Sequence, residues 1–292
     1  MAVAERPAWV NDELFPFESR FVDIDGHSIH YVDEGSGPTL LFLHGNPTWS
    51  FDYSKVIESL RQEFRCIAMD YPGFGLSVAA PGYRYLPAEH AQVIEGLVEA
   101  LALSGVTLVA HDWGGPIGLA AVQHRPEAFD RLVLTNTWAW PVGAPLVQIM
   151  SHAMGSPIGR LLIRQFNLFV NVMIPVGHRL TKPTDEQMAH YQKALDSPAR
   201  REASAVFPRE ITSSRAFLAE VAAGLTDIAA LPTLIIWGDS DFAFGDNELR
   251  RWEQTFTDHQ TVIVKGAGHF VPSDAPEQFA AAIRRWHTPS GS

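Results

Sequence analysis

The stretch Val106–Gly115, VTLVAHDWGG, decides how this chain folds. Its first residues form a β-type run, and its glycines open a helical stretch that reaches His124. Asp112 therefore lies at the apex of a sharp turn from strand to helix, between Ala110 and Gly114. Small residues two positions before and after the apex let the strand and the helix approach closely, as in the nucleophile elbow, whose usual form is G-x-S-x-G. Taken alone, the motif fits equally well an Asp112 that only caps the helix.

Short apolar runs on both sides of this stretch predict further strands. Residues 39–43 (TLLFL) are apolar throughout, as in a strand that is buried on both faces. Asp25-Gly26 lies between two β-type runs and is a hairpin signal. The predicted strands cover residues 21–24, 28–32, 39–43, 66–69, 106–110, 131–134, 233–237 and 261–264, and helices cover residues 52–64, 87–103, 114–124, 247–255 and 275–286.

Between residues 137 and 215 the strand pattern stops and the sequence is almost wholly helical. We therefore interpret the chain as an α/β protein, in which a mostly parallel, eight-stranded sheet flanked by helices is interrupted after the sixth strand. An insertion at the carboxyl end of a strand lies over the ligand crevice, so it is predicted to form a helical cap. The predicted domains are a main domain of residues 1–136 and 216–292 and a cap of residues 137–215.

Composition and charge narrow the classes of function. Hydrophobic residues make up 46% and charged residues 19% of the 292 residues, as in ordinary soluble enzymes. The formal net charge of -11 disfavours nucleic acids and anionic membranes as partners and favours a neutral substrate. Cys66 is the only cysteine, so an internal disulfide is excluded. Neither a signal peptide nor an apolar run of the ~18 residues that a membrane span needs is present, so we expect a cytoplasmic protein. The sequence leaves the oligomeric state open.

Two later loops carry side chains that suit catalysis. The loop GAGHF places His269 between the last strand and the last helix, where it can reach Asp112 and act as a base. The loop WGDSD follows the preceding strand, and its Asp241 is predicted to orient His269. Asp239 and Asp246 are nearby alternatives, and each could be an ordinary turn residue. The order nucleophile, acid, base along the chain matches that of hydrolases built on such sheets.

Two turns follow earlier strands. In LHGNPT, at residues 43–48, Asn46 can supply a backbone N–H to an oxyanion and point its side-chain amide into the site, whereas His44 is expected to be structural. The turn DYPGFG, at residues 70–75, is also assigned to structure, because the lysine of a phosphate loop does not follow it.

Together, HGNPT at residues 44–48 and HDWGG at residues 111–115 resemble the haloalkane dehalogenases, and the resemblance extends from about Phe15 to Trp286. It implies the α/β-hydrolase fold and assigns the nucleophile, base and acid of a catalytic triad to Asp112, His269 and Asp241.

The same resemblance implies that the side chains of Asn46 and Trp113 bind halide and that their backbone N–H groups form the oxyanion hole. One branch of the family has a Glu acid after the preceding strand; Asn136 occupies that position here, which supports Asp241 as the acid. Neither a metal nor an organic cofactor is implied.

The activity implied is hydrolysis of carbon–halogen bonds in small neutral haloalkanes, giving an alcohol, a halide ion (chloride or bromide) and a proton. A carboxylate is ionised at neutral pH and needs no base to become a nucleophile, so Asp112 can displace halide and form an alkyl ester. An indole N–H and an amide N–H can donate to the departing halide. His269 would then activate water against the ester.

Other activities of such scaffolds fit less well. Epoxide hydrolases typically need two tyrosines on the cap, and residues 137–215 contain only Tyr191. A fluoroacetate-type dehalogenase would want an arginine near the nucleophile, where this chain has Trp113. A luciferase-like oxygenase shares much of the scaffold but would emit light and release no halide. A non-catalytic receptor could dispense with parts of the catalytic set, whereas this chain has a candidate for every member of it.

The pocket walls are predicted less sharply, because apolar cap residues could equally form the core of the cap. The candidates are Trp138, Trp140, Phe166, Phe169, Val170, Met173, Ile174 and Phe242.

Overall fold

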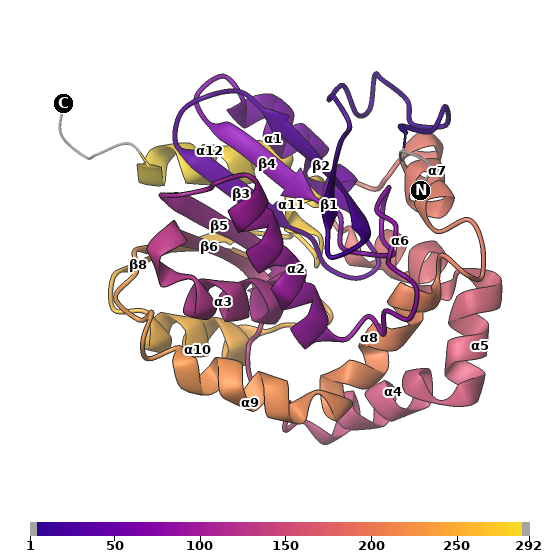
Figure 1. Ribbon diagram of the computed structural model, residues 1–292. Coiled ribbons are helices and arrows are strands. Elements are labelled where there is room, and N and C mark those ends of the chain that lie inside the picture. The colour runs from indigo at the N-terminus through magenta and orange to yellow at the C-terminus, as the bar shows by residue number, and fades with distance from the viewer. Residues whose placement is uncertain (1–4, 288–292) are drawn as a thin grey trace.

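The computed structural model describes residues 5–287 and contains one eight-stranded sheet (Figure 1). The strand order is β1-β2-β4-β3-β5-β6-β7-β8. β2 pairs antiparallel with β1 and β4, and all other pairs are parallel, which confirms the predicted sheet. The strands are β1 (Arg20–Ile24), β2 (His27–Glu34), β3 (Thr39–Leu43), β4 (Arg65–Met69), β5 (Val106–Asp112), β6 (Phe129–Thr137), β7 (Thr233–Gly238) and β8 (His259–Val264).

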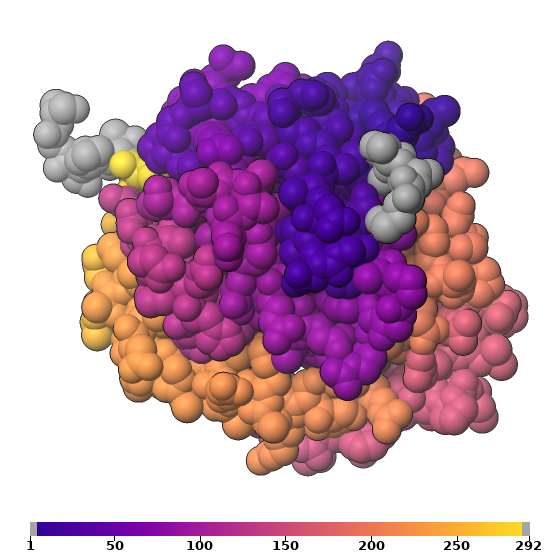
Figure 2. Space-filling view, viewed as in Figure 1, coloured from indigo at the N-terminus to yellow at the C-terminus, as the bar shows by residue number. Residues whose placement is uncertain are grey.

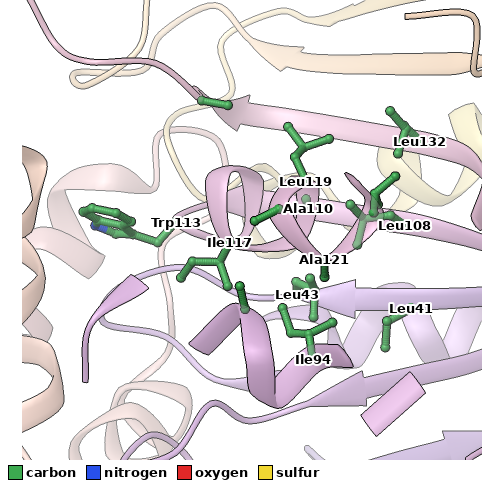
Figure 3. Close-up of a cluster of buried hydrophobic side chains, with 14 of the residues drawn as sticks. Leu41, Leu43, Ile94, Leu108, Ala110, Trp113, Ile117, Leu119, Ala121 and Leu132 are labelled. Carbon is green, nitrogen blue, oxygen red and sulfur yellow. The ribbon is translucent and has the colours of Figure 1, made fainter. Parts of the chain in front are cut away.

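Both faces of this sheet are covered by helices, because alternate residues of its central strands point to opposite sides. Leu41 and Leu43 of β3 pack with α2 (Pro87–Ala100) and α3 (Gly114–His124), and Figure 3 shows this cluster. Leu40 and Phe42 pack instead with α1 (Ser54–Leu60) and α12 (Pro276–His287). Each fully buried side chain of this kind contributes roughly 1.5–3 kcal/mol to folding. The continuous apolar run therefore reflects burial on both faces.

The helices within residues 145–213 lie beyond one end of the sheet (Figure 1), and they form the pink and light-orange surface at the lower right of Figure 2. We use the name cap for the predicted segment 137–215. It contains α4 (Pro145–Gly155), α5 (Pro157–Phe166), the π-helix η3 (Phe169–Met173), α6 (Ile174–Gly177), α7 (Asp185–Ala194) and α8 (Glu202–Ser213).

The remaining helices complete the main body. α9 (Arg215–Gly224) contacts α3, because the Gln123 side chain donates a hydrogen bond to the Val221 carbonyl at 2.9 Å. The others are α10 (Asp246–Thr255), the short α11 (Val271–Asp274), and the 3-10 turns η1 (Ser50–Tyr53) and η2 (Pro126–Ala128). Within residues 5–287, none of the helices is long and apolar enough to cross a membrane.

Most strands are longer than the apolar pattern predicts, β5 and β6 among them. β5 continues to Asp112 and β6 to Thr137, and these two residues pair with each other. The added residues of β6, Thr135, Asn136 and Thr137, are polar yet fully buried, because their side chains or main chain bond within the protein. Apolar periodicity does not detect such residues. Conversely, the single helix predicted over residues 52–64 is η1 followed by α1, which ends at Leu60.

Candidate active site

A cavity of about 90 Å³ lies between the carboxyl ends of the central strands and the cap. Asn46, Asp112, Trp113 and His269 line it from the side of the sheet. The cap and the nearby loops supply a mostly apolar wall made of Met150, Ser151, Met154, Phe169, Met173, Pro208, Ile211, Phe242, Ala243 and Phe270. Four of the five predicted site residues thus meet in one cavity.

Asp112 occupies the turn between β5 and α3 in a left-handed conformation, with φ of 50°. Glycines make this turn possible: a Cβ atom on Gly45 would lie 2.4 Å from the Asp112 Cβ atom, and one on Gly115 would lie 1.9 Å from Thr137 Oγ1. Thr137 Oγ1 donates to the Asp112 carbonyl oxygen at 2.5 Å, which holds the turn from the neighbouring strand.

The Asp112 carboxylate does not cap α3. Trp113 occupies the N-cap position, without a side-chain capping bond, and Asp112 Oδ1 instead accepts the backbone N–H of Asn46 at 2.9 Å. Burial raises the pKa of Asp112, while the charge of His269 and the backbone N–H groups of Asn46 and Trp113 oppose this rise. The geometry therefore argues against the helix-cap alternative and leaves Oδ2 as the carboxylate oxygen that faces His269.

His269 lies between two carboxylates. Its Nδ1 is 3.0 Å from Asp241 Oδ2, and its Nε2 is 3.8 Å from Asp112 Oδ2. Burial alone would lower the pKa of His269, but the charge and hydrogen bond of Asp241, together with the charge of Asp112, raise it to about 8. The Asp241 contact assigns the Nδ1 proton, so Nε2 is the atom that faces Asp112 and the cavity.

Asp241 is held by Asn136, a contact that the sequence does not reveal. Asn136 Nδ2 donates to Asp241 Oδ2 at 2.8 Å, and Asn136 Oδ1 accepts the backbone N–H of Gly238 at 2.8 Å. Asp239 turns away from His269 and accepts the backbone N–H of Gly266 at 2.7 Å. Asp246 begins α10. Of the three candidate acids, only Asp241 bonds to the histidine.

The Asn46 side chain meets α8 at a proline. Pro208 lies inside α8 and lacks the N–H that would bond to the carbonyl oxygen of Ser204, four residues earlier. Asn46 Nδ2 contacts that free carbonyl oxygen at 3.5 Å. Trp113 is held from behind by Trp138 and Phe207, with ring centroids 4.7 and 4.8 Å away. Both predicted halide-binding side chains thus have defined orientations at the cavity.

Of the candidate pocket walls, Phe169, Met173 and Phe242 line the cavity. Three aromatic candidates lie elsewhere. Phe166 is 67% exposed, Trp138 packs behind Trp113, and Trp140 packs against Trp252 at 4.7 Å.

Val170 and Ile174 are buried in the core and do not line the cavity. Sequence reasoning missed Met150 and Met154. The two methionines are four residues apart, so they lie on one face of α4. This spacing is the sequence signal that could have identified them.

Comparisons with known proteins agree with this geometry. Residues 38–276 match the family model described as the alpha/beta hydrolase fold. The chain is 42% identical over 275 residues to haloalkane dehalogenase 2 of Mycobacterium tuberculosis, covering 93% of this chain and 95% of that protein. The chain belongs to the haloalkane dehalogenase family of α/β hydrolases. The crystal structure of haloalkane dehalogenase DatA from Agrobacterium tumefaciens is 27% identical, with a TM-score of 0.83 over 92% of this chain and 95% of that one.

A differently named relative shares the scaffold. The chain is 31% identical over 287 residues to a cis-3-alkyl-4-alkyloxetan-2-one decarboxylase of Shewanella oneidensis, covering 95% of this chain and 90% of that protein. The name of this relative describes a reaction other than dehalogenation.

Proposed function

We propose that this family member is a hydrolytic haloalkane dehalogenase that works through a covalent ester on Asp112. The observation that carries the proposal is the placement of a buried carboxylate, an indole and an amide around one small, mostly apolar cavity. A neutral haloalkane fits such a cavity, and both N–H donors can bind the halide that leaves.

In the first half of the reaction, Asp112 Oδ2 attacks the halogen-bearing carbon. The carbon–halogen bond breaks as the carbon–oxygen bond forms, and the halide departs with its electron pair. Trp113 Nε1 and Asn46 Nδ2 donate to the halide, and Asn46 can do so with one proton while the other faces Ser204. Asp112 Oδ1, held by the Asn46 backbone N–H, becomes the carbonyl oxygen of the ester.

In the second half, His269 Nε2 takes a proton from water, which attacks the carbonyl carbon of the ester. The backbone N–H groups of Asn46 and Trp113 stabilise the oxyanion. Asp241 stabilises the imidazolium and keeps the Nδ1 proton in place. Collapse of the intermediate releases the alcohol and regenerates the Asp112 carboxylate.

The experiment that tests the function measures halide release from 1-bromobutane and 1,2-dibromoethane, with products identified by mass spectrometry. We expect bromide and the matching alcohol in equal amounts. Diol formation from epoxides without bromide release would contradict the proposal. Tyr191 also argues against epoxides: its hydroxyl is buried and bonds to Asp52, so it does not reach the cavity.

A second candidate function is favoured by the relative named as an oxetanone decarboxylase. Asp112 could attack the ring carbon that bears the ring oxygen, opening a strained cyclic ester with a carboxylate as the leaving group. That carboxylate group then leaves as carbon dioxide, the electrons of its carbon–carbon bond form the double bond of an alkene, and the bond to Asp112 breaks to restore the aspartate. Release of carbon dioxide from a cis-dialkyl oxetanone, measured beside the bromide panel, separates the two functions. The reaction with the larger kcat/KM identifies the substrate class.

The two nearby aspartates provide a matched pair of variants. Asp241→Asn is expected to lower turnover at least about 100-fold, because the new amide would present an N–H to His269 or to Asn136. Asp239→Asn should change turnover no more than about threefold, since Asp239 bonds only to a surface loop. Steady-state bromide release measures both. A larger loss in Asp239→Asn would move the acid role to Asp239.

The raised pKa of His269 predicts a pH dependence for the second half-reaction. In the free protein His269 stays protonated up to about pH 8. Ester formation removes the negative charge of Asp112, so the pKa of His269 falls and the histidine becomes neutral, ready to act as a base. The hydrolysis rate should thus rise with pH, with a midpoint below about 8.

Single-turnover kinetics at several pH values, beside an NMR titration of His269 in the free protein, measure the two midpoints. A hydrolysis midpoint at or above the NMR value would contradict this role of the Asp112 charge.

Protonated His269 also stabilises the folded protein. That contribution is complete below about pH 6.5 and is lost as the pH rises through about 8.

A further inference from the structure

A second cluster of buried polar side chains lies behind the catalytic histidine, away from the cavity. Asp52, in η1, is 1% exposed; its Oδ1 accepts a hydrogen bond from the Tyr191 hydroxyl at 3.0 Å and lies 2.6 Å from Ser273 Oγ. Ser273 Oγ lies 2.9 Å from His178 Nε2, and His178 Nδ1 lies 2.8 Å from the Ile174 carbonyl oxygen. The reaction proposed above uses none of these side chains.

The contacts determine how many protons this cluster holds. A carbonyl oxygen only accepts, so His178 Nδ1 carries a proton toward Ile174. The contact between His178 and Ser273 needs a proton, and the contact between Ser273 and Asp52 needs another. The Ser273 hydroxyl supplies only one. If that hydroxyl pointed to the Phe270 carbonyl oxygen, 3.3 Å away, both contacts would need protons from elsewhere. At least one further proton therefore resides on Asp52 or on His178 Nε2.

Burial decides between these two positions. It raises the pKa of Asp52 and lowers the pKa of His178, so a neutral pair is favoured over an ion pair. Among the groups that face Asp52, hydrogen bonds from Ser273 and Tyr191 to the ionised carboxylate and the charge of His269 oppose this rise in pKa, while Asp274 adds to it. The extra proton belongs on Asp52 Oδ1, directed at Ser273.

This cluster adjoins the bonds that hold the main chain of His269. The His269 N–H donates to the carbonyl oxygen of Gly177, which precedes His178, at 2.8 Å. The His269 carbonyl oxygen accepts from His111 Nε2 at 2.9 Å. His111 Nδ1 lies 4.0 Å from Asp52 Oδ2, and within residues 5–287 neither atom has a hydrogen-bond partner. Asp52 therefore lies next to three parts of the molecule: the cap, the turn that carries Asp112 and the loop that carries His269.

We propose that Asp52 is a positioning residue, which carries a buried proton and, through Ser273 and His178, holds the His269 loop in place opposite Asp112. The inference rests on the proposed function, because that function makes His269 the base. Asp52 does not line the cavity. Its loss should therefore slow hydrolysis of the ester and leave formation of the ester unchanged.

Two substitutions distinguish the effect of the Asp52 proton from the effect of the side chain as a whole. Asp52→Asn keeps the shape and presents one permanent N–H to Ser273 and the other to the Tyr191 hydroxyl, which then accepts instead of donating. Its rate of ester hydrolysis should therefore stay within about threefold of the wild type. Asp52→Ala removes the donor, and the displaced loop should slow hydrolysis about 10- to 100-fold. Rapid-quench measurement of bromide and alcohol follows the two half-reactions separately. Ser273→Ala breaks the same chain of contacts with a smaller cavity and serves if Asp52→Ala does not fold.

Infrared difference spectroscopy tests the proton directly. Wild type minus Asp52→Asn should show the C=O band of a protonated carboxylic acid at pH values where an ordinary aspartate, with a pKa of 3.8, is already ionised. Absence of that band, equal slowing in the Asn and Ala variants, or parallel loss of both half-reactions would each overturn the proposal. A wild type that forms no ester would contradict the proposed function instead, and the band would still report on the proton.

Discussion

Replacing Asp112 with asparagine is expected to abolish halide release, with a loss of at least about 10⁴-fold, or roughly 5.5 kcal/mol of transition-state stabilisation. An amide is a poor nucleophile toward an sp3 carbon, and the rest of the site cannot form the ester. Asparagine is the suitable substitute because it tolerates the left-handed backbone conformation at this position, φ of 50°, better than alanine does. The loss is therefore chemical, and the fold is preserved.

The measurement is bromide release with 1,2-dibromoethane, and intact mass confirms that the asparagine has not deamidated to aspartate. Asp239→Asn is the matched control, since it makes the same chemical change on a nearby loop. Thermal unfolding of both variants should stay close to that of the wild type. Residual turnover within about tenfold of the wild type would remove Asp112 as the nucleophile.

The sequence predicts the sheet better than it predicts the pocket, and the reason is physical. A strand that is buried on both faces is apolar along its whole length, so local composition identifies β3. The polar end of β6 is not detected by that criterion, because Thr135 and Asn136 are buried next to residues far along the chain: Thr135 pairs with Ile236 of β7, and the Asn136 side chain bonds to Gly238. Asn136 bonds to Asp241, 105 residues later, and no local pattern reports such a bond.

The residues that line the cavity are hard to predict from the sequence for a related reason. Trp140 lies three residues after the end of β6, where an aromatic residue could face the cavity. In the structure its ring lies against Trp252, with the Arg251 guanidinium 4.1 Å from its centroid. Both partners come from α10, so the environment of Trp140 depends on how a later helix docks. The sequence predicts the turns that carry Asp112 and His269 because turns at strand ends are local, whereas the walls of the cavity depend on packing between distant elements.

Replacing His269 with alanine is expected to trap the enzyme as a covalent ester. Ester formation needs Asp112 and the halide donors, none of which His269 supplies, so the first half-reaction should continue. Hydrolysis then lacks its base and should slow at least about 10³-fold. The main-chain bonds of residue 269 to Gly177 and from His111 do not involve the imidazole ring, so the loop should keep its path.

Intact-mass spectrometry after incubation with 1-bromobutane measures the adduct, which should add one butyl group in place of one hydrogen. Bromide should be released in a single burst of one equivalent per chain. His124→Ala is the matched control, because His124 is a partly exposed histidine on α3 that pairs with Glu95 far from the cavity; it should turn over normally and carry no adduct. The double variant Asp112→Asn with His269→Ala should stay unmodified. Trapping on that double variant would place the ester elsewhere, whereas full turnover by His269→Ala would show that another group activates water.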